Sequence, residues 1–518
     1  MLAAMPPSPS RRPDRAGPPV RDRGDACPGA LRLHSAADGE LARVRLPAGD
    51  LTASQARALA YAAERLGDGH LSLTSRGNVE LRGLPDGCGG RLAALLADAG
   101  LLPSVRHERI RNVLASPLAG LDHHTPSDVR LWARSLDALL CASEPATALS
   151  GRFLFVLDDG RGDVAGLGGD VTLLAESGRR APAGTAFAPG AASGYGALLR
   201  VGADPAALRI APDDVPRAAL IAAETFLAVA AESGSGAWRV TELPATRPLT
   251  AHDVRGALRA AGITAEPAEP AEPAEPVAHA KTPGPRPTVP YADATVPGPV
   301  EGPDGRRALV VLAPLGRLTA AQWRLLAEVA AVDGSGALRL TPWRGIVVPG
   351  LPADAAEGRL GELAAAGLVT DPASPWRGVT ACTGLPGCAK SLTDVRSDAS
   401  AALAEGRPVP ADAPAPPVGP PVHWSGCARR CGHPHGAWTD VLATPDGYRT
   451  TAVHPNSPAP QDVSRETPRQ GAVSRETPPP GPASHEGAEP TPESRDLAPP
   501  SDSPHPPSTP QPTTPRLQ

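Results

Sequence analysis

The chain has 518 residues, enough for two or three domains of ordinary size plus extended tails. Its net charge of −5 is too small to indicate nucleic acid or a membrane surface as the main partner, and no run of about 18 apolar residues predicts a membrane-spanning helix. The N-terminal stretch MLAAMPPSPSRRPDRAGPPV lacks the apolar core of a secretory signal, and the seven cysteines are unevenly spread. We therefore expect a cytoplasmic, reducing location, where clustered thiols bind metals more often than they form disulfides.

Three segments have a low-complexity composition that does not support a packed core. Residues 1–26 are rich in Pro and Arg, residues 265–276 repeat the tripeptide Ala-Glu-Pro four times, and the chain from about residue 456 is rich in Pro, Ser, Thr and Glu. We expect disordered tails and a stiff, extended linker between two folded blocks, which cover residues 27–262 and 297–455.

The two blocks are related by an internal duplication. Residues 51–85 align without a gap on residues 318–352, at a constant offset of 267 and with sixteen of 35 positions identical. Each copy is predicted to contain a strand, a helix, two strands around a tight turn and a further helix, at about 90–100 and 357–367. Thr52 is the expected N-cap of the first helix. The sequence therefore predicts an α+β half-domain that occurs twice, with the copies paired about a pseudo-two-fold axis and a cleft between them.

Four cysteines fall within 50 residues of one another, just after the second copy. They follow the pattern Cys-x5-Cys-x38-Cys-x3-Cys and are Cys382, Cys388, Cys427 and Cys431. At the junction after the first copy, Ser116 aligns with Cys382. Structural zinc sites usually use tighter knuckles, often with His, whereas four thiolates in glycine-rich loops supply one sulfur to each iron of a [4Fe–4S] cluster. The pattern favours the cluster, with zinc and inert buried thiols as the alternatives.

This cysteine pattern at the end of a duplicated half-domain resembles the sulfite and nitrite reductase superfamily, over residues 27–455. Within it, ACTGLPGCAKSLTDVRSDA, VHWSGCARRCGHP and GRFLFVLDDGRGDVAGLGGD are most similar to the precorrin-3B synthase family, oxygen-dependent monooxygenases of aerobic cobalamin biosynthesis. The resemblance implies a [4Fe–4S] cluster on the four cysteines, with Cys431 facing a tetrapyrrole.

The resemblance also implies ferredoxin-like half-domains, each followed by a reductase-type domain. The expected divisions are a disordered N-terminus at 1–26, half-domain 1 at 27–110, an α/β domain at 111–262, an Ala/Glu/Pro linker at 263–296, half-domain 2 at 297–370, the cluster domain at 371–455 and a disordered tail at 456–518.

Two departures from the reductases favour the synthase branch. The reductases have Pro-Asn between the last two cysteines, where this chain reads Ala428-Arg429-Arg430. Sulfite-reducing members carry Lys-x-Lys in the segment that reads GRFLF here, so that Arg152 matches the first lysine and Leu154 the second. The loss of one cation weakens a site for a small oxyanion.

A tetrapyrrole fringed with acetates and propionates needs several cations, and arginine binds a carboxylate through two parallel hydrogen bonds. The arginines expected to bind such a ligand are Arg76, Arg82, Arg111 and Arg152. Arg76 and Arg111 align with reductase positions that meet the anionic ligand, and Arg344 and Arg377 lie near the equivalent turns of the second copy. Because the chain is rich in arginine, a solvated surface charge is the alternative for each.

The resemblance further suggests a mononuclear non-heme iron that activates oxygen. Two His and a carboxylate are the usual ligands of such iron. The residues that could supply them are Asp122, His123, His124, His433 and His435. Adjacent histidines point in different directions on a strand, so surface-loop histidines are the alternative. No Rossmann or P-loop motif is present, and we expect electrons from an external donor, either NAD(P)H-linked or a ferredoxin.

The function implied by the resemblance is conversion of precorrin-3A to precorrin-3B, by hydroxylation and lactone formation with O2. The alternative is a siroheme-dependent sulfite or nitrite reductase, in which the tetrapyrrole is a cofactor and not the substrate. A third interpretation, from another class, is a zinc-stabilised tetrapyrrole carrier without catalysis.

Overall fold

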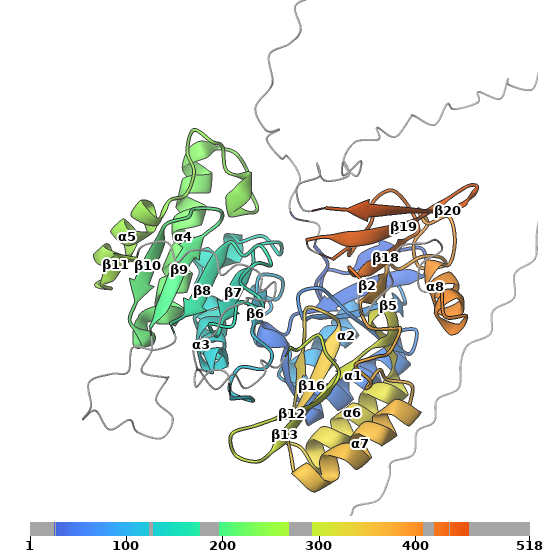
Figure 1. Cartoon of the computed structure of the whole chain (residues 1–518). Coiled ribbons are helices and arrows are strands. Elements are labelled where there is room, and N and C mark those ends of the chain that lie inside the picture. Colours follow the sequence, from blue (N-terminus) through green and yellow to red (C-terminus); the bar gives the residue numbers. More distant parts are fainter. Residues whose placement is uncertain are drawn as a thin grey trace, which may run out of the picture. The chain divides into compact units, whose positions relative to one another are not determined.

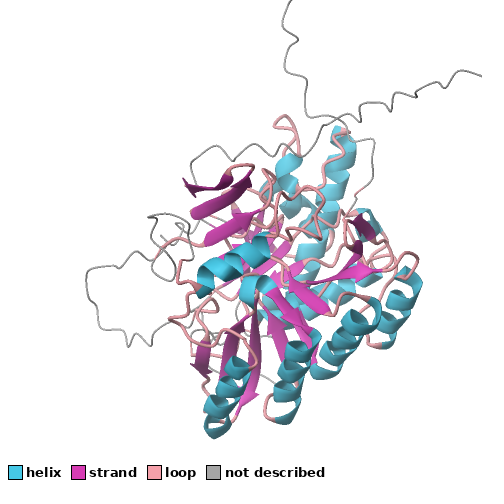
Figure 2. Ribbon diagram, turned by 90° about the vertical axis from the view of Figure 1, so that its right-hand side faces the viewer, coloured by secondary structure: helices cyan, strands magenta, loops and turns pink. Residues whose placement is uncertain are grey.

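The computed structural model describes residues 25, 27–123, 128–176, 196–268, 293–407, 419–434 and 436–454. These residues form four β-sheets with helices packed against them (Figures 1 and 2). Two sheets belong to the duplicated half-domains, and one further sheet follows each half-domain in the chain. Within the described ranges, no helix is long and apolar enough to span a bilayer.

Each half-domain is a five-stranded antiparallel sheet with two helices. The first sheet has the order β1 (His34–Ala36), β2 (Gly39–Val44), β5 (Val79–Leu84), β4 (His70–Leu73) and β14 (Arg317–Thr319). The second has the order β12 (Gly298–Glu301), β13 (Arg307–Leu312), β16 (Gly345–Leu351), β15 (Ala337–Leu340) and β3 (Asp50–Thr52). The helices are α1 (Ala53–Leu66), α2 (Gly89–Asp98), α6 (Ala320–Val332) and α7 (Ala353–Ala365). The predicted α+β class with duplicated half-domains is confirmed.

The two half-domains exchange a strand. β14 of the second copy pairs with β4 of the first, and β3 of the first copy pairs with β15 of the second. Hydrogen bonds follow the same reciprocity: the Ala53 N–H donates to the Gly336 carbonyl at 2.9 Å, and the Ala320 N–H donates to the Gly69 carbonyl at 3.0 Å. The offset of 267 relates these pairs, since 53 + 267 = 320 and 69 + 267 = 336. The contacts are those of a pseudo-two-fold pair.

The duplication extends to unusual backbone details. Thr52 and Thr319 each cap a helix through a capping box with the glutamine three residues later, so the predicted N-cap is confirmed. Just before each cap, Ala48 and Leu315 occupy the left-handed region, with φ of 58° and 50°. Few residues other than glycine adopt this conformation, so its recurrence shows that the two copies share one local geometry.

The half-domains share one hydrophobic core, in which α1 and α6 lie side by side (Figure 1). Trp323 on α6 is fully buried, and its Nε1–H donates to the Ala56 carbonyl of α1 at 2.8 Å. Ala56 and Trp323 are equivalent positions, because 56 + 267 = 323. The two helices therefore meet with a large residue from one copy against a small residue from the other.

The sheets that follow the half-domains share a strand order. In the first, β6 (Val113–Ala115), β7 (Phe155–Asp158) and β8 (Val171–Ala175) are parallel, and β9 (Ala197–Val201) is antiparallel to β8. In the second, β17 (Val379–Ala381), β18 (Val422–Ser425) and β19 (Trp438–Thr444) are parallel, and β20 (Gly447–Val453) is antiparallel to β19. Helices α3 (Val129–Ala142) and α8 (Val395–Ala404) follow β6 and β17. Figure 1 shows α8 beside this second sheet.

The first of these sheets is longer, because β10 (Ala207–Ile210) and β11 (Ala265–Ala268) extend it beyond β9. Helices α4 (Val215–Ser233) and α5 (Ala251–Ala260) complete this part. β11 lies within residues 263–296, the range that the sequence suggested as linker, and it pairs as an edge strand. An edge position tolerates Pro267, which has no N–H to donate.

We expect Trp323→Ala to destabilise the folded protein by about 3–5 kcal/mol, because it leaves a cavity where the half-domains meet. Trp323→Phe keeps most of the volume but removes the donor to the Ala56 carbonyl, so it should cost about 1–3 kcal/mol. Urea unfolding followed by circular dichroism measures both. Val332→Ala is the control, since Val332 is 64% exposed on the same helix. Equal stability of the Ala variant and the wild type would contradict the shared core.

Candidate functional site

The four cysteines lie on two loops that leave the same edge of a parallel sheet. Cys382 directly follows β17, and its N–H donates to the carbonyl of Trp424 on β18 at 2.9 Å. Cys427 and Cys431 lie in the loop after β18. Cys382, Cys388 and Cys427 are half-buried and Cys431 is exposed. Partial desolvation of the thiol raises the pKa of Cys382 and also that of Cys431, although Cys431 as a whole residue is exposed. Neighbouring thiols of the set also raise both pKa values. The fold thus brings together all four cysteines predicted as ligands.

Two kinds of metal group use four thiolates as ligands. A tetrahedral zinc ion binds four sulfurs at about 2.3 Å, and a [4Fe–4S] cluster takes one thiolate for each iron. The described cysteines offer four thiols on two loops at one edge of the sheet, as either group needs.

Arg82 ties the first cysteine loop to the first half-domain. Its guanidinium forms two hydrogen bonds of 2.9 Å with Asp38 and donates to the carbonyl of Gly387 at 2.6 Å. Within the cysteine region, the Gly426 N–H donates to the Cys382 Sγ at 3.2 Å. The role of Arg82 in ligand binding stays a prediction, and its contacts favour a role in holding the loop.

Arg396 on α8 places positive charge beside the cysteines. Its Nε donates to the Cys382 carbonyl at 3.1 Å, while its Nη1 is buried and has no hydrogen-bond partner among the described residues. Burial, and next the charges of Arg317 and Arg344, lower the pKa of Arg396 to about 10. A buried guanidinium with a spare donor is stabilised by a nearby anion. A cluster held by four thiolates is such an anion, so these residues fit it.

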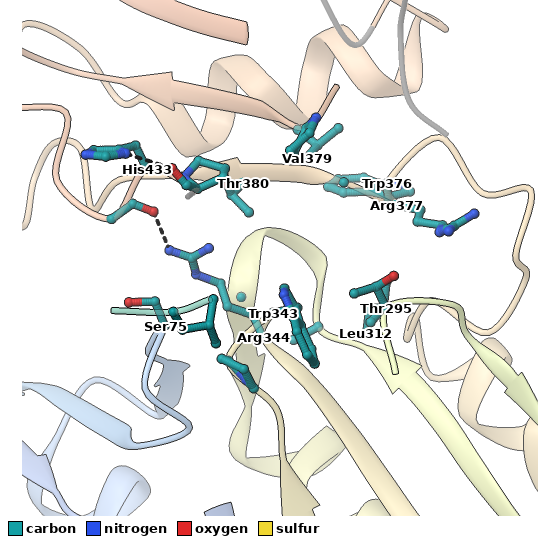
Figure 3. A pocket seen from close by; sticks show the side chains of 18 of the residues that line it. Ser75, Thr295, Leu312, Trp343, Arg344, Trp376, Arg377, Val379, Thr380 and His433 are labelled. Carbon is teal, nitrogen blue, oxygen red and sulfur yellow. Dashed lines mark hydrogen bonds between the residues drawn. The ribbon is translucent and has the colours of Figure 1, made fainter. Parts of the chain in front are cut away.

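A cavity of about 370 Å³ lies beside the loop that carries the last cysteine. Figure 3 shows side chains that line it. Gly432 and His433, which follow Cys431 directly, line one side of it. Trp343 and Trp376 supply large apolar surfaces, and Thr380 contributes from β17. The cavity therefore combines a mainly apolar wall with polar groups next to the cysteine loop, as is usual for a site that binds a small organic molecule.

Arg344 is the cation that joins this cavity to the cysteine loop. Its Nη2 donates to the Gly432 carbonyl at 2.8 Å (Figure 3). Burial lowers the pKa of Arg344 to about 10. Arg344 has a φ of 63°, and its counterpart in the first copy is Gly77 with a φ of 64°, since 77 + 267 = 344. The second copy thus places an arginine in a conformation that costs a side chain about 1–2 kcal/mol.

Two of the other predicted arginines lie close to each other on the first copy's side. Arg76 donates through Nη1 to the Gly151 carbonyl at 3.4 Å, and the next residue, Arg152, pairs with Glu242 at 3.4 Å. The Arg152 guanidinium also lies 5.7 Å from the ring centroid of Trp238. Burial and neighbouring arginines lower the pKa of Arg76 to about 10. Their part in ligand binding stays a prediction.

Arg111, by contrast, is buried in an ion pair. It forms two hydrogen bonds with Asp137, at 2.6 and 2.7 Å. Leu154, which stands where sulfite reductases have a second lysine, is buried in a small apolar cluster with Leu114 and Val164. Asp137 therefore neutralises the charge of Arg111, and Leu154 provides no cation.

The first copy fills the space that corresponds to the cysteine loops with carboxylates and a guanidinium. Ser116, the counterpart of the first cysteine, donates to Asp163 at 2.6 Å. Arg161, whose side chain is 1% exposed, pairs with Asp122 at 3.0 Å and with Asp159 at 2.7 Å. Asp122, considered above as an iron ligand, therefore takes part in this ion-pair network. The network occupies a place where the second copy has thiols.

Among the described residues, the histidines considered as ligands of a non-heme iron do not form a cluster of metal ligands. His433 stacks on Trp438 with ring centroids 5.1 Å apart. His124 and His435 lie outside the described residues. No group of three ligand atoms within 4.8 Å of one another includes a described histidine. The non-heme iron stays a prediction.

Sequence reasoning missed His423, which is fully buried on β18. Its Nδ1 lies 2.8 Å from the Thr380 Oγ1, and its Nε2 lies 3.2 Å from the Cys431 carbonyl. Burial lowers the pKa of His423 well below its ordinary value. One signal could have found it: the equivalent residue of the first copy is Val156, so a polar group replaces an apolar one next to the cysteines.

Comparisons with known proteins agree with this architecture. A family described as the nitrite/sulfite reductase ferredoxin-like half domain matches residues 34–98 and 299–366, which fall on the two copies. A precorrin-3B synthase of Sinorhizobium sp is 27% identical over 437 residues, covering 84% of this chain and 83% of that protein. A ferredoxin–nitrite reductase of Synechococcus elongatus is 28% identical over 426 residues, covering 77% and 75%. The structure of the Mycobacterium tuberculosis NirA protein superimposes with a TM-score of 0.55 at 18% identity, covering 80% and 73%.

Asp163 makes the stability of the first copy depend on pH. Burial, and next the charge of Asp158, raise the pKa of Asp163 to about 7 from the ordinary 3.8. Below about pH 4 the carboxyl is protonated in both the folded and unfolded states. As the pH rises towards 7, only the unfolded state ionises, so stability is lost; above 7 the loss is constant.

Asp163→Asn should therefore raise the melting temperature at pH 8 and change it little at pH 4.5, with a gain of about 2–4 kcal/mol at the higher pH. The amide can still accept the Ser116 hydroxyl. Differential scanning calorimetry at both pH values measures the effect, with the exposed Asp446→Asn as control. The same effect of Asp163→Asn at both pH values would contradict the raised pKa.

Proposed function

Because the chain has the duplicated scaffold of the sulfite and nitrite reductase superfamily, we propose that it is an iron–sulfur monooxygenase of the precorrin-3B synthase type. It converts precorrin-3A to precorrin-3B by hydroxylation and lactone formation. One oxygen atom of O2 enters the macrocycle, and the other leaves as water, with two protons and two electrons from an external donor. The similarity to the Sinorhizobium precorrin-3B synthase over 84% of the chain supports this choice.

The observation that carries the proposal is the set of four cysteines at one edge of the sheet. Cys382, Cys388, Cys427 and Cys431 would hold a [4Fe–4S] cluster, which would supply electrons one at a time. The spacing Cys-x5-Cys-x38-Cys-x3-Cys along the sequence favours this cluster over a single zinc ion, because structural zinc sites usually use tighter knuckles. The spare Nη1 donor of Arg396 beside the Cys382 carbonyl supplies positive charge for it.

The ligand of the adjoining cavity is proposed to be the tetrapyrrole. Trp343 and Trp376 provide apolar surface for the macrocycle, and Arg344 and Arg377 provide cations for its acetates and propionates. Arg76 and Arg152 are proposed to bind further carboxylates from the first copy's side. Holding the substrate by its rim fixes which carbon is exposed to oxygen.

Two features favour the tetrapyrrole as substrate over siroheme as cofactor of a reductase. Arg111 is neutralised by Asp137, and Leu154 contributes a buried apolar side chain where sulfite reductases have a lysine. Both changes weaken the cationic site that a small oxyanion such as sulfite or nitrite needs. The siroheme-dependent reductase remains the second candidate, supported by the similarity to the Synechococcus ferredoxin–nitrite reductase.

Further parts of the proposal come from the resemblance. A mononuclear non-heme iron is proposed to activate O2, and the electron donor is proposed to be NAD(P)H-linked or a ferredoxin. The proposed location is the cytoplasm, where thiols stay reduced.

Anaerobic purification with iron and sulfide analysis tests the cluster, and a visible spectrum tests the nature of the tetrapyrrole. We expect about four inorganic sulfides per chain, at least as many irons, and a broad absorption shoulder without a Soret band. Cys382→Ser and Cys427→Ser should lose the iron and sulfide, whereas Cys141→Ser, outside the set, should retain them. An intense Soret band with a red band would establish the reductase instead. Zinc without iron or sulfide would establish the non-catalytic carrier.

Substitution of Arg344 tests the role of the cavity, because its effect on ligand binding can be measured separately from its effect on folding. Arg344→Gly removes the cation and relieves the left-handed backbone, so the melting temperature should stay equal or rise. Arg344→Ala removes the same cation but keeps the strain, so it should melt lower than the Gly variant.

Both variants should bind uroporphyrin III, a stable polycarboxylate tetrapyrrole, about 10- to 100-fold more weakly than the wild type, measured by porphyrin fluorescence. Arg91→Ala, at an exposed position of α2, is the control and should bind normally. Unchanged binding by Arg344→Gly would remove Arg344 from the tetrapyrrole site.

A further inference from the structure

The positions next to the cysteine loops differ between the two copies in one coordinated way. Thr380 on β17 and His423 on β18 are paired neighbours in the parallel register. The equivalent pair on β6 and β7 is Leu114 and Val156, which lie in a small apolar cluster. A polar pair, of which His423 is fully buried and Thr380 half-buried, therefore replaces a buried apolar pair in the copy that carries the cysteines. Burying polar groups is unfavourable unless they are hydrogen-bonded. The replacement of apolar by polar side chains at these positions therefore indicates a functional role.

The hydrogen bonds of His423 determine which ring nitrogen carries the proton. The Nε2 lies 3.2 Å from the Cys431 carbonyl, which can only accept, so Nε2 is the donor. A fully buried neutral imidazole has one N–H, and Nδ1 must then accept. Its neighbour at 2.8 Å is the Thr380 hydroxyl, which can donate. The Val422 carbonyl lies farther from this hydroxyl, at 3.2 Å, so the single hydroxyl proton is assigned to the shorter contact with His423. The order is Thr380 O–H to His423 Nδ1, and His423 Nε2–H to the Cys431 carbonyl.

We propose that Thr380 and His423 form a hydrogen-bond relay that positions the backbone of Cys431 and links the tetrapyrrole cavity to the metal cluster. The proposal rests on the cluster assigned to the four cysteines above. Thr380 lines the cavity, so one end of the relay is at the ligand and the other is at the cysteine that adjoins it. His423 is a positioning residue, because it acts through the Cys431 peptide.

The relay is part of a wider arrangement that fixes an exposed loop. Cys431 and Gly432 are exposed, so burial does not hold them. Arg430, in the left-handed region with a φ of 49°, pairs with Asp440 at 2.5 Å. His423 then donates to the Cys431 carbonyl, and Arg344 donates to the Gly432 carbonyl at 2.8 Å. Two successive peptide oxygens are thus each held by a side chain.

The relay has a direct electrostatic consequence. A donor aimed at the Cys431 peptide favours the more negative, reduced state of a cluster bound there, because hydrogen bonding around the ligands sets the potential. A ligand that accepts the Thr380 proton takes it from His423 and weakens the relay. A ligand that donates to Thr380 strengthens it. A ligand in the cavity therefore changes the reduction potential of the cluster.

The test compares Thr380→Val, which keeps the shape and removes the hydroxyl, with Thr380→Ser, which keeps the hydroxyl. The full chain is purified anaerobically. A redox titration monitored by electron paramagnetic resonance then gives the midpoint potential of the cluster. We expect a more negative midpoint potential and altered g-values in the Val variant, with unchanged iron and sulfide content, and wild-type behaviour in the Ser variant. Thr172→Val, on β8 of the first copy, is the matched control and should match the wild type.

A Val variant with an intact cluster and a wild-type potential and spectrum would overturn the relay. Absence of iron and sulfide from the wild type would instead overturn the proposed cluster. In that case the relay is tested by nitrogen-15 NMR of histidine-labelled protein, with the His423 signals assigned from their loss in His423→Gln. A proton on Nε2 and none on Nδ1 is expected, and a proton on Nδ1 would refute the relay whatever metal is present.

Discussion

The exchange of β3 and β14 between the two half-domains is the constraint on which the rest of the structure depends. Each sheet is completed by a strand from the other copy, and Trp323 closes the core between them. This pairing fixes the β4–β5 turn of one copy relative to the β15–β16 turn of the other. Ser75 from the first turn and Arg344 from the second both line the cavity. The cavity is therefore a product of the duplication, and neither copy forms it alone.

The same scaffold supports different chemistry in its two copies because the differences are confined to loops and to a few strand positions. Val164 is fully buried at the position that corresponds to the exposed Cys431, since 164 + 267 = 431. Arg161 and its carboxylates occupy the first copy's loop. An ion-pair network occupies that loop without a cofactor, whereas the thiol loops carry the residues proposed to bind a metal group. This explains how one copy can lack thiols and still fold.

The sequence predicted the features that depend on local pattern. The helix capped by Thr52, the strand pair around Gly77 and the duplication itself could all be read from periodicity and alignment. The grouping of the four cysteines followed from their spacing. The strand exchange was not predictable, because antiparallel pairing between distant segments leaves no local signal. His423 was missed for a similar reason: a histidine on a strand reveals its partner only when the neighbouring loop is placed beside it.

The arginines are indistinguishable in the sequence but have different partners in the folded protein. In the sequence Arg82, Arg111, Arg344 and Arg396 look alike, yet the first two form ion pairs with Asp38 and Asp137. Among the described carboxylates, none pairs with Arg344 or Arg396, although burial lowers both pKa values. Keeping buried guanidinium groups without carboxylates is unfavourable unless an anion completes the site. The cluster and the tetrapyrrole proposed above are both anions. Arg344 and Arg396 are cations without a carboxylate partner among the described residues, and they lie on different sides of the cysteine loops: Arg344 lines the cavity, and Arg396 contacts the Cys382 carbonyl.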